Sequence, residues 1–340
     1  MIQEAIEKLS RHNDLTGKEM ESSMEEIMTG RIETPLIVSF LTALNEKGQT
    51  IEELTAAVSV MRRHSTKIKT KHSLVLDTCG TGGDSKGTFN ISTAVALVVS
   101  ASGIAVAKHG NRSVSSRSGS ADILEALGVN INMDVDSISR CLDEIGLAFL
   151  FAPNLHPAMK YAMPARKQIA KRTIFNILGP LTNPAEATHQ LVGVYDRQLV
   201  EPVAGVLGNL GSTHALVVHG QDGLDEVTTT TKTFVSEEYE GRIKNYEVSP
   251  EEFGFKKAQL EDLSGGTASD NAGILLDILK GKQGPKSDIV LLNSAFAIYA
   301  ADKVKSVGEG IELARNSIDS GKALGKLELL KEYSKGKING

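Results

Sequence analysis

The chain has 340 residues, of which 41% are hydrophobic, and its formal net charge is −5. This length suits one large domain and a smaller one, and the acidic balance argues against a nucleic-acid-binding protein. Two cysteines, Cys79 and Cys141, cannot form a disulfide framework and lack zinc-site spacing, so a cytoplasmic protein is expected. We find no signal peptide and no apolar run near the roughly 20 residues that span a bilayer, so no membrane association is expected.

The N-terminal segment, to about residue 65, is predicted to be helical without an intervening strand. Thr16 with Glu19, and Thr50 with Glu53, have the spacing of capping boxes. The segment 35–45 (PLIVSFLTALN) is apolar nearly all round, which for a helix indicates burial on more than one side. A contact in a homodimer and ordinary core packing both explain this pattern.

From residue 73 onward, short aliphatic or β-branched runs alternate with glycine-rich loops and helical stretches, which is typical of a mainly parallel α/β sheet. Strands are predicted at 73–76, 103–107, 148–151, 214–219 and 288–292. Helices are predicted at 92–102, 120–127, 135–145 and 197–210. The segment 164–184 has helical character up to a Gly-Pro pair, and it is expected to pack with the N-terminal helices.

The predicted fold is therefore α/β, with a mainly parallel central sheet flanked by helices and a smaller all-helical N-terminal domain. The helical domain takes residues 1–70 and is joined by a helical return at about 160–187. The catalytic α/β domain takes residues 71–159 and 188–340.

The densest chemical signal is the segment 77–93 (DTCGTGGDSKGTFNIST), between a predicted strand and a predicted helix. Gly80, Gly82 and Gly83 let the backbone turn tightly and bring N–H groups close to an anion, while the helix adds its positive dipole end. These features predict a phosphate-binding loop. The GxGxxG pattern fails because Ser85 takes the third glycine position, and the Walker A order is absent, so neither NAD nor ATP is indicated.

A second polar loop, 108–122 (KHGNRSVSSRSGSAD), also lies between a predicted strand and helix. Its lysine, arginines and serines offer several donors for phosphate groups. Loops that follow neighbouring parallel strands meet at one end of the sheet, where α/β proteins usually bind ligands. We therefore expect the two loops to form one site, against the alternative of a solvated polar loop.

The segment 219–226 (HGQDGLDE) presents Asp222, Asp225 and Glu226 after a predicted strand. Carboxylates near phosphate groups are the setting that Mg²⁺ prefers, although adjacent surface carboxylates are common without any metal.

Taken together, GTGGD with TFNIST, KHGNRSVSSRSGSAD, RTIFNILGPLTNP and DGLDE resemble the anthranilate phosphoribosyltransferase family, in the same order over nearly the whole chain. The resemblance implies an N-terminal helical domain that makes a homodimer contact and an α/β domain like that of the pyrimidine nucleoside phosphorylases. It also implies Mg²⁺-dependent transfer of the phosphoribosyl group of phosphoribosyl pyrophosphate to the amine of anthranilate, the second step of tryptophan biosynthesis from chorismate.

The resemblance implies site residues, motif by motif. Ser92, Asp225 and Glu226 would hold Mg²⁺, and Gly80, His109, Asn111 and Arg166 would bind anthranilate. Arg166 would face the substrate carboxylate, since a guanidinium matches it with two parallel hydrogen bonds; a solvated helix charge is the alternative. Phosphoribosyl pyrophosphate would contact Gly80, Gly83, Asp84, Thr88, Asn90, Ile91, Ser92, Thr93, Lys108, His109, Gly110, Asn111, Arg112, Ser113, Val114, Ser115, Ser116 and Ser120.

No covalent nucleophile is expected. Cys79 has no base beside it in the motif and is interpreted as a small loop filler. His109 is expected to contact the substrate and not to act as an essential base, because an aromatic amine is already unprotonated at neutral pH.

Two rival functions remain. One is a pyrimidine nucleoside phosphorylase of the same fold, against which the NIST, GNRSVSS and DGLDE segments favour a diphosphate donor with its metal. The other is a non-catalytic nucleic-acid-binding relative, which should carry a basic groove and bind with steep salt dependence.

Overall fold

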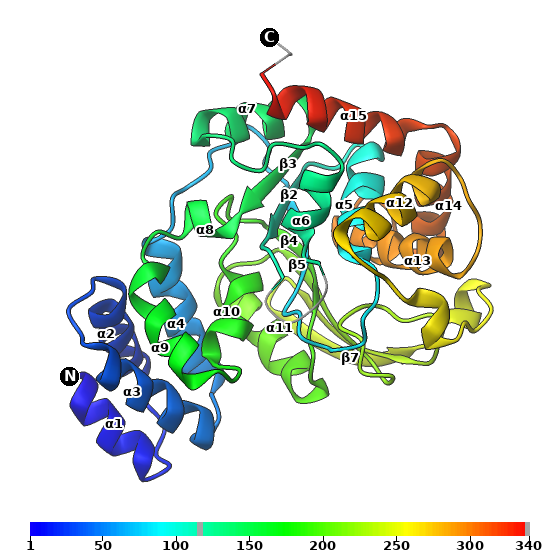
Figure 1. The fold of residues 1–340 in the computed structure, drawn as a ribbon. Helices are drawn as coiled ribbons and strands as arrows, with labels where there is room; N and C mark the ends of the chain where they lie inside the picture. Colours follow the sequence, from blue (N-terminus) through cyan, green and yellow to red (C-terminus); the bar gives the residue numbers. More distant parts are fainter. Residues whose placement is uncertain (114–117, 337–340) are drawn as a thin grey trace.

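The computed structural model of the chain describes residues 1–113 and 118–336. A lobe of helices from the N-terminal segment lies beside a larger part built on a sheet (Figure 1). Among the described residues, no helix is both long enough and apolar enough to cross a membrane.

The N-terminal lobe begins with four helices, as predicted. They are α1 (Ile2–Ser10), α2 (Gly17–Met28), α3 (Thr34–Lys47) and α4 (Ile51–Arg63). Both predicted capping boxes form: the Thr16 hydroxyl accepts from the Glu19 N–H at 3.4 Å, and the Glu19 carboxylate accepts from the Thr16 N–H at 2.7 Å. Thr50 and Glu53 do the same for α4.

The helical return predicted near residue 164 is confirmed, as two helices rather than one. It contains α9 (Met159–Ile169) and α10 (Ile174–Leu181), preceded by the short α8 (Ala152–Leu155). Helix α9 packs on α2 and α3, and α10 packs on α3 and α4 (Figure 1). The Gly-Pro pair does not end the helix, since Pro180 lies within α10.

In the described part of the chain, seven strands form one sheet in the order β3-β2-β1-β4-β5-β6-β7. Strands β1 to β5 pair in parallel, whereas β6 and β7 pair antiparallel at one edge. The expected mainly parallel sheet is therefore confirmed. The strands are β1 (Leu76–Gly80), β2 (Val106–Gly110), β3 (Leu147–Phe151), β4 (His189–Gly193), β5 (His214–Gly220), β6 (Thr233–Tyr239) and β7 (Arg242–Val248).

Helices cover both faces of the sheet. The α/β part contains α5 (Ile91–Ala101), α6 (Ser120–Ala126), α7 (Val135–Ile145), α11 (Val200–Asn209), α12 (Ala268–Leu279), α13 (Pro285–Ala300), α14 (Val307–Asp319) and α15 (Lys322–Ser334), with short 3₁₀ turns at Arg197–Leu199, Pro250–Phe253 and Leu260–Leu263.

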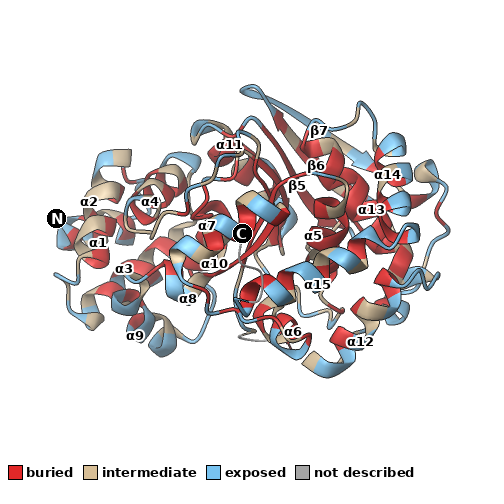
Figure 2. Cartoon of the chain, turned by 90° about the horizontal axis from the view of Figure 1, so that it is seen from above, coloured by how far each residue is buried: buried red, intermediate tan, exposed pale blue. Residues whose placement is uncertain are grey.

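Successive strand residues point to opposite faces of the sheet and so divide the core in two. In β5, Leu216 and Val218 join the cluster under α5 and α13, while Ala215 and Val217 join the cluster that continues through α10 and α11 into the N-terminal lobe. Figure 2 shows the buried residues along the sheet and on the inner faces of the helices. The N-terminal lobe is thus packed against α10 and α11, which cover one face of the sheet.

Some predicted strands were wrong. The run 288–292 lies inside α13, whose sixteen residues begin at Pro285 after Gly284. Strands β4, β6 and β7 were not predicted, and β1 and β2 begin three residues later than expected, at Leu76 and Val106.

An ionic cluster lies at the amino ends of β4 and β5. The buried His214 ring is 2.8 Å from Asp302 Oδ1 through Nδ1 and 3.1 Å from Glu237 Oε1 through Nε2. Hydrogen bonds and charge from these carboxylates outweigh burial and raise the pKa of His214. Burial lowers the pKa of the neighbouring His189. The protonated form of His214 therefore joins β5, β6 and the turn that follows α13.

Candidate active site

The order of the parallel strands changes direction between β1 and β4. From this point the chain builds β2 and β3 on one side and β5 on the other, and such a switch point leaves a crevice at the carboxyl ends of the strands. Gly80 and Gly193 are register partners at these ends. The two predicted polar loops leave β1 and β2 at this edge of the sheet.

The first loop runs from β1 to α5. Of the three glycines expected to turn its backbone, Gly82 and Gly83 have positive φ, whereas Gly80 is the last residue of β1 and does not. Gly82, Gly83 and Gly87 have φ of 63°, 78° and 70°, and Ser85 also lies in the left-handed region. The loop base is fixed on β4, because Thr81 N–H donates to Gly193 O at 2.9 Å and Tyr195 N–H donates to the Thr81 hydroxyl at 3.0 Å. The loop therefore leads from the sheet edge to the amino end of α5.

The acidic segment after β5 lies directly on this loop. Asp225 Oδ2 accepts from the Gly82 N–H at 2.9 Å. A β-carbon at Gly193 would lie 1.6 Å from Asp225 O, and one at Gly80 would lie 2.6 Å from Asp225 Oδ2. Two strand-end glycines thus make the room in which Asp225 crosses the ends of β1 and β4.

Three carboxyl groups influence one another here. Burial and the nearby Asp84 raise the pKa of Asp225 to about 7. Burial, followed by the charge of Asp225, raises the pKa of Glu226 well above its ordinary value. Burial also raises the pKa of Asp84. Such a group of carboxyls resists ionisation unless a cation joins it.

This donor set fits Mg²⁺. The carboxylate oxygens of Asp225 and Glu226 and the hydroxyl of Ser92 are hard ligands. The mutual repulsion of the carboxylates favours a divalent cation between them. Among the described residues, no group of three or more His, Cys, Asp or Glu side chains is arranged to hold a metal ion. Mg²⁺ commonly takes only one or two carboxylates from the protein and completes its shell with water and substrate phosphates, so an incomplete set is suitable.

Lys108 lies below the two loops. The residue is 4% exposed, and its ammonium donates to Thr78 O and to the Ser92 hydroxyl, the latter at 3.2 Å. It therefore joins β2 to β1 and to the first turn of α5, where Ile91 and Thr93 are also buried. Thr88 forms an isolated bridge with Ser264.

The second loop is closed at its base by Asp122. Its Oδ2 accepts from Ser113 N–H at 3.1 Å and from Gly119 N–H at 2.8 Å. Arg112 forms ion pairs with Asp122 and Glu125 at 2.9 and 2.5 Å, so its guanidinium is already engaged by protein carboxylates. The Ser120 hydroxyl donates to Asn111 O at 3.3 Å, and Gly110 packs against Ser120. The candidates Val114, Ser115 and Ser116 lie outside the described residues.

Asn271, on α12, joins the two loops and was not predicted. Its amide nitrogen donates to Asn90 Oδ1 at 3.1 Å and to the Ser118 hydroxyl at 2.8 Å. Its own carbonyl accepts from Gly266 N–H at 2.7 Å. The side chain is buried, so these hydrogen bonds fix Asn90 of the first loop relative to Ser118 of the second.

His109 is held by a buried polar group that sequence reasoning also missed. Asp77 accepts from His109 N–H at 3.1 Å and from the Asn183 amide at 2.7 Å. The His109 ring lies 3.2 Å from the His156 ring between their Nε2 atoms. Burial, followed by His156, lowers the pKa of His109 to about 3. His109 is therefore neutral near pH 7, as expected of a contact residue and not of an acid.

Arg166 lies on α9, in the helical return. Its guanidinium lies over the Phe175 ring, 5.5 Å from the centroid, and burial lowers its pKa. Among residues 1–113 and 118–336 no carboxylate lies within ion-pairing distance of it. A half-buried, unneutralised arginine is suited to an anionic ligand.

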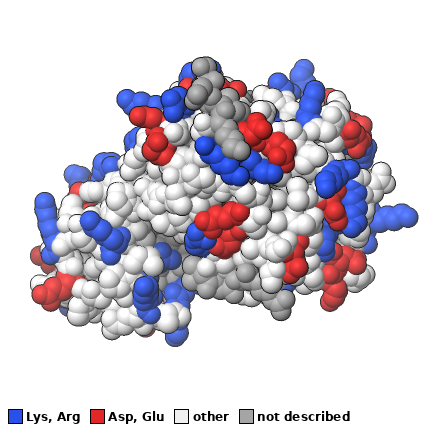
Figure 3. Space-filling view, turned by 45° about the horizontal axis from the view of Figure 1, so that its top comes forward, with Lys and Arg blue, Asp and Glu red and all other residues white. Residues whose placement is uncertain are grey.

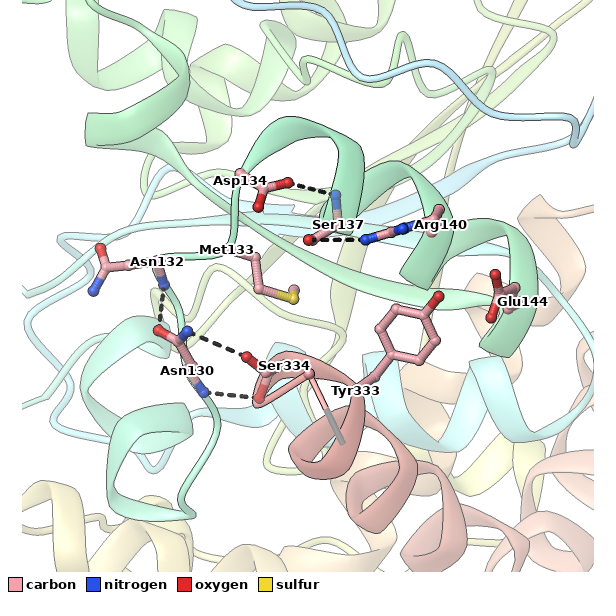
Figure 4. A pocket seen from close by; sticks show the side chains of 10 residues that line it. Asn130, Asn132, Met133, Asp134, Ser137, Arg140, Glu144, Tyr333 and Ser334 are labelled. Atoms are coloured by element: carbon pink, nitrogen blue, oxygen red, sulfur yellow. Dashed lines mark hydrogen bonds between the residues drawn. The ribbon is translucent and has the colours of Figure 1, made fainter. Parts of the chain in front are cut away.

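A separate cavity of about 470 Å³ lies between α7 and α15 (Figure 4). Polar groups that line it form hydrogen bonds with one another. Asn130 N–H donates to the Ser334 hydroxyl at 2.9 Å, and Ser137 N–H donates to Asp134 at 2.7 Å. None of its lining residues belongs to the loops described above.

On the face in Figure 3, basic and acidic side chains are interspersed.

The chain is similar to known proteins over nearly its whole length. Residues 72–324 match the α/β domain of a glycosyl transferase family, and residues 3–65 match the helical bundle domain of such a family. A protein of Methanobrevibacter smithii called anthranilate phosphoribosyltransferase is 52% identical over 334 residues, covering 98% of this chain and 99% of the relative. One of Petrotoga mobilis with the same name is 50% identical over 329 residues, covering 97% and 96%.

Solved structures are similar over the same length. The anthranilate phosphoribosyltransferase of Thermus thermophilus superposes with a TM-score of 0.92 at 40% identity, covering 97% of this chain and 99% of that one. The Saccharomyces cerevisiae structure in complex with PRPP and Mg superposes with a TM-score of 0.90 at 28% identity, covering 98% of each chain.

Proposed function

Since the chain belongs to the anthranilate phosphoribosyltransferase family, we propose that the crevice at the β1/β4 switch point transfers the phosphoribosyl group of phosphoribosyl pyrophosphate to the amine of anthranilate. The reaction gives N-(5-phosphoribosyl)anthranilate and pyrophosphate. The observation that carries this assignment to the crevice is the meeting of the glycine loop with the acidic segment, through the hydrogen bond from Gly82 N–H to Asp225.

The diphosphate sugar is assigned to the two loops. The Gly80–Thr93 segment would supply backbone N–H groups, and residues 108–120 would supply further donors. Lys108 and Arg112 act here in supporting roles, since Lys108 holds the strands together and Arg112 is paired with Asp122 and Glu125. Asn90 and Asn111 remain candidates for direct contact with the ribose and its phosphates.

Ser92, Asp225 and Glu226 would hold Mg²⁺, with Asp84 close by. When bound, the cation supplies positive charge against the diphosphate as it leaves. The raised pKa values of Asp225 and Glu226 support this role, because a cation would offset the burial and the mutual repulsion that oppose their ionisation.

Anthranilate is assigned to the side of the crevice near the helical return. Arg166 would bind the carboxylate, and Gly80, His109 and Asn111 would contact the ring and the amine. The lone pair of the amine forms the new bond to the anomeric carbon, while the bond to the diphosphate oxygen breaks with its electron pair. The proton that the amine then loses can pass to water, so neutral His109 needs only to position the ring.

Catalysis then comes from orientation and from electrostatic stabilisation of the departing diphosphate, without a covalent intermediate. Cys79 lies within β1 and not in the loop, where the sequence interpretation had placed it; it is buried, and its thiol donates to Pro180 O at 3.6 Å. Burial raises the pKa of its thiol well above the ordinary value, which disfavours a nucleophilic thiolate.

The activity can be tested by mixing the purified chain with anthranilate, phosphoribosyl pyrophosphate and Mg²⁺ and following the loss of anthranilate fluorescence. We expect a loss that requires all three components and that chelation of the metal abolishes. Cleavage of thymidine with inorganic phosphate, together with unchanged anthranilate fluorescence, would instead identify a nucleoside phosphorylase.

We also propose that the chain is a cytoplasmic homodimer that pairs through α3 and α9. Leu36 and Val38 on α3 stay half-buried, and Tyr161 and Met163 on the adjacent α9 are each 38% exposed. Light scattering should give twice the chain mass for the wild type. Charged substitutions at Val38 and Met163 should give a monomer, and a monomeric wild type would refute this interface.

A further inference from the structure

Arg172 is the residue that joins the helical return to the glycine loop. It lies in the short connection between α9 and α10, two residues after Ala170, which has a left-handed φ of 51°. Its guanidinium donates to Gly83 O. The residue is exposed, and no carboxylate of residues 1–113 and 118–336 forms an ion pair with it, so its position has another explanation.

A second contact places the guanidinium over an aromatic ring. Its central carbon lies 4.0 Å from the centroid of the Tyr195 ring, which is the geometry of a cation–π contact. Tyr195 follows β4, and its N–H holds Thr81 at the base of the same loop. Arg172 therefore contacts both the middle of the glycine loop and the strand connection that supports its base.

The two sides of this link serve different substrates in the proposed function, on which this inference rests. Gly83 belongs to the loop assigned to the diphosphate sugar. Arg166, assigned to the anthranilate carboxylate, lies at the end of α9, where its backbone carbonyl accepts from the Ala170 N–H at 3.1 Å. Only the connection 170–173 separates this end of α9 from α10, so a shift of α9 is transmitted to Arg172 through a few residues.

We propose that Arg172 is a positioning residue that couples the two substrate sites, so that ordering of the glycine loop by the diphosphate sugar sets the position of α9 for the aromatic acid. Arginine suits this role because its planar group can stack on Tyr195 while its edge donates to a backbone carbonyl. Lysine retains the charge but has no plane to stack.

The coupling is measured by titration calorimetry of Mg²⁺–phosphoribosyl pyrophosphate into the full chain, without and with saturating 2-methylbenzoate. This acid keeps the ring and carboxylate of anthranilate, while a methyl group replaces the attacking amine, so no reaction occurs. We expect the acid to lower the Kd of the wild type by about fivefold or more, and that of Arg172→Gln by less than about twofold.

Matched variants separate coupling from folding. Lys171→Gln removes the neighbouring exposed charge and should keep the wild-type coupling. Tyr195→Phe keeps the ring and should also keep it, whereas Tyr195→Leu removes the ring and Arg172→Lys removes the plane, so both should weaken the coupling. If Arg172→Gln fails to fold, Tyr195→Leu provides the same test.

The outcomes distinguish this inference from the proposed function. A wild type that does not bind Mg²⁺–phosphoribosyl pyrophosphate overturns both. A wild type that binds it without coupling, or an Arg172→Gln variant that keeps the full coupling, overturns the inference alone. Arg172→Gln could also raise the Kd for Mg²⁺–phosphoribosyl pyrophosphate while the ratio of the Kd values without and with 2-methylbenzoate stays that of the wild type. This result would make Arg172 a local support of the loop and would also overturn the coupling role.

Discussion

Replacing Gly193 with alanine tests the steric basis of the site. The new β-carbon would lie 1.6 Å from the carbonyl oxygen of Asp225, whereas real β-carbons almost never approach closer than 3.0 Å. The backbone at Asp225 or at the end of β4 must therefore move by about 1.4 Å, the difference between the two distances. The atoms of Asp225 that the new β-carbon would meet are backbone atoms, so a side-chain rotation cannot relieve the clash.

This backbone displacement would occur at the point where the acidic segment meets the glycine loop. Misplacement of reacting groups by about 1 Å can cost about 100-fold in rate, so we expect kcat/KM of Gly193→Ala to fall by about that factor or more. The fluorescence assay measures this loss, and Mg²⁺ titration should show a weakened metal dependence. Thermal unfolding should also occur at a lower temperature, because the strand end carries the strain.

The control is Gly325→Ala, on α15, where an added β-carbon meets nothing within 4 Å. A helical glycine replaced by alanine should gain up to about 1 kcal/mol of stability, with unchanged kcat/KM. If Gly193→Ala keeps kcat/KM within a factor of about two of the wild type, the close passage of Asp225 over the strand ends is not required, and the reasoning fails.

Three further variants test other parts of the account. Arg166→Ala should chiefly raise the KM for anthranilate, by about tenfold or more for a lost charge-assisted pair; a rise confined to phosphoribosyl pyrophosphate would refute its assignment. Asn271→Ala removes the donor to Asn90 Oδ1 and to the Ser118 hydroxyl, and it removes the acceptor of the Gly266 N–H. We therefore expect a loss of about 1–3 kcal/mol in unfolding free energy and a raised KM for phosphoribosyl pyrophosphate. An unchanged KM would show that the two loops do not depend on this link. The raised pKa of His214 gives stability that is complete below its ordinary value of 6.5 and is lost as pH rises through the folded pKa. His214→Gln should therefore remove this alkaline loss in thermal unfolding. His189, whose lowered pKa has the opposite sign, is present in both proteins, and loss of the His214 charge removes one of the smaller causes of that lowering. An unchanged pH profile would contradict the ionic cluster.

Features encoded by neighbouring residues could be predicted from the sequence. The capping boxes of α2 and α4 formed as expected, because each depends on two residues three positions apart. The left-handed turns of the glycine loop are equally local, since Gly82 and Gly83 adopt them without steric cost. The acidic segment 219–226 could also be recognised because its carboxylates are close together in the sequence. Its hydrogen bond with Gly82 could not be predicted.

Features that depend on distant partners could not be predicted. Asn271 lies 181 positions from Asn90, and nothing in its own helix distinguishes it from a solvated amide. Asn183 and Asp77 are separated by 106 positions. Gly193 offered a weak signal, as an isolated glycine at a strand end, but only the sheet register showed what it accommodates.

The strand errors have separate causes. The run 288–292 is aliphatic enough for a buried strand, and a short apolar run cannot be distinguished from a buried helix by periodicity; the flanking Gly284 and Pro285 favoured the helix. The β6–β7 hairpin did leave a signal in the sequence, which is the Glu240-Gly241 pair between two segments that could form strands. In the structure these two residues adopt the positive φ of a hairpin turn, 49° and 81°.

The central claim is that the glycine loop, the second polar loop and the acidic segment surround one magnesium-bound diphosphate sugar at the β1/β4 switch point. A crystal structure of the chain with phosphoribosyl pyrophosphate and Mg²⁺ tests it most directly. The account predicts the diphosphate against residues 80–93 and the cation between the substrate and the side chains of Ser92, Asp225 and Glu226. Density for the ligand at another edge of the sheet, or a cation held without either acidic residue, would contradict it.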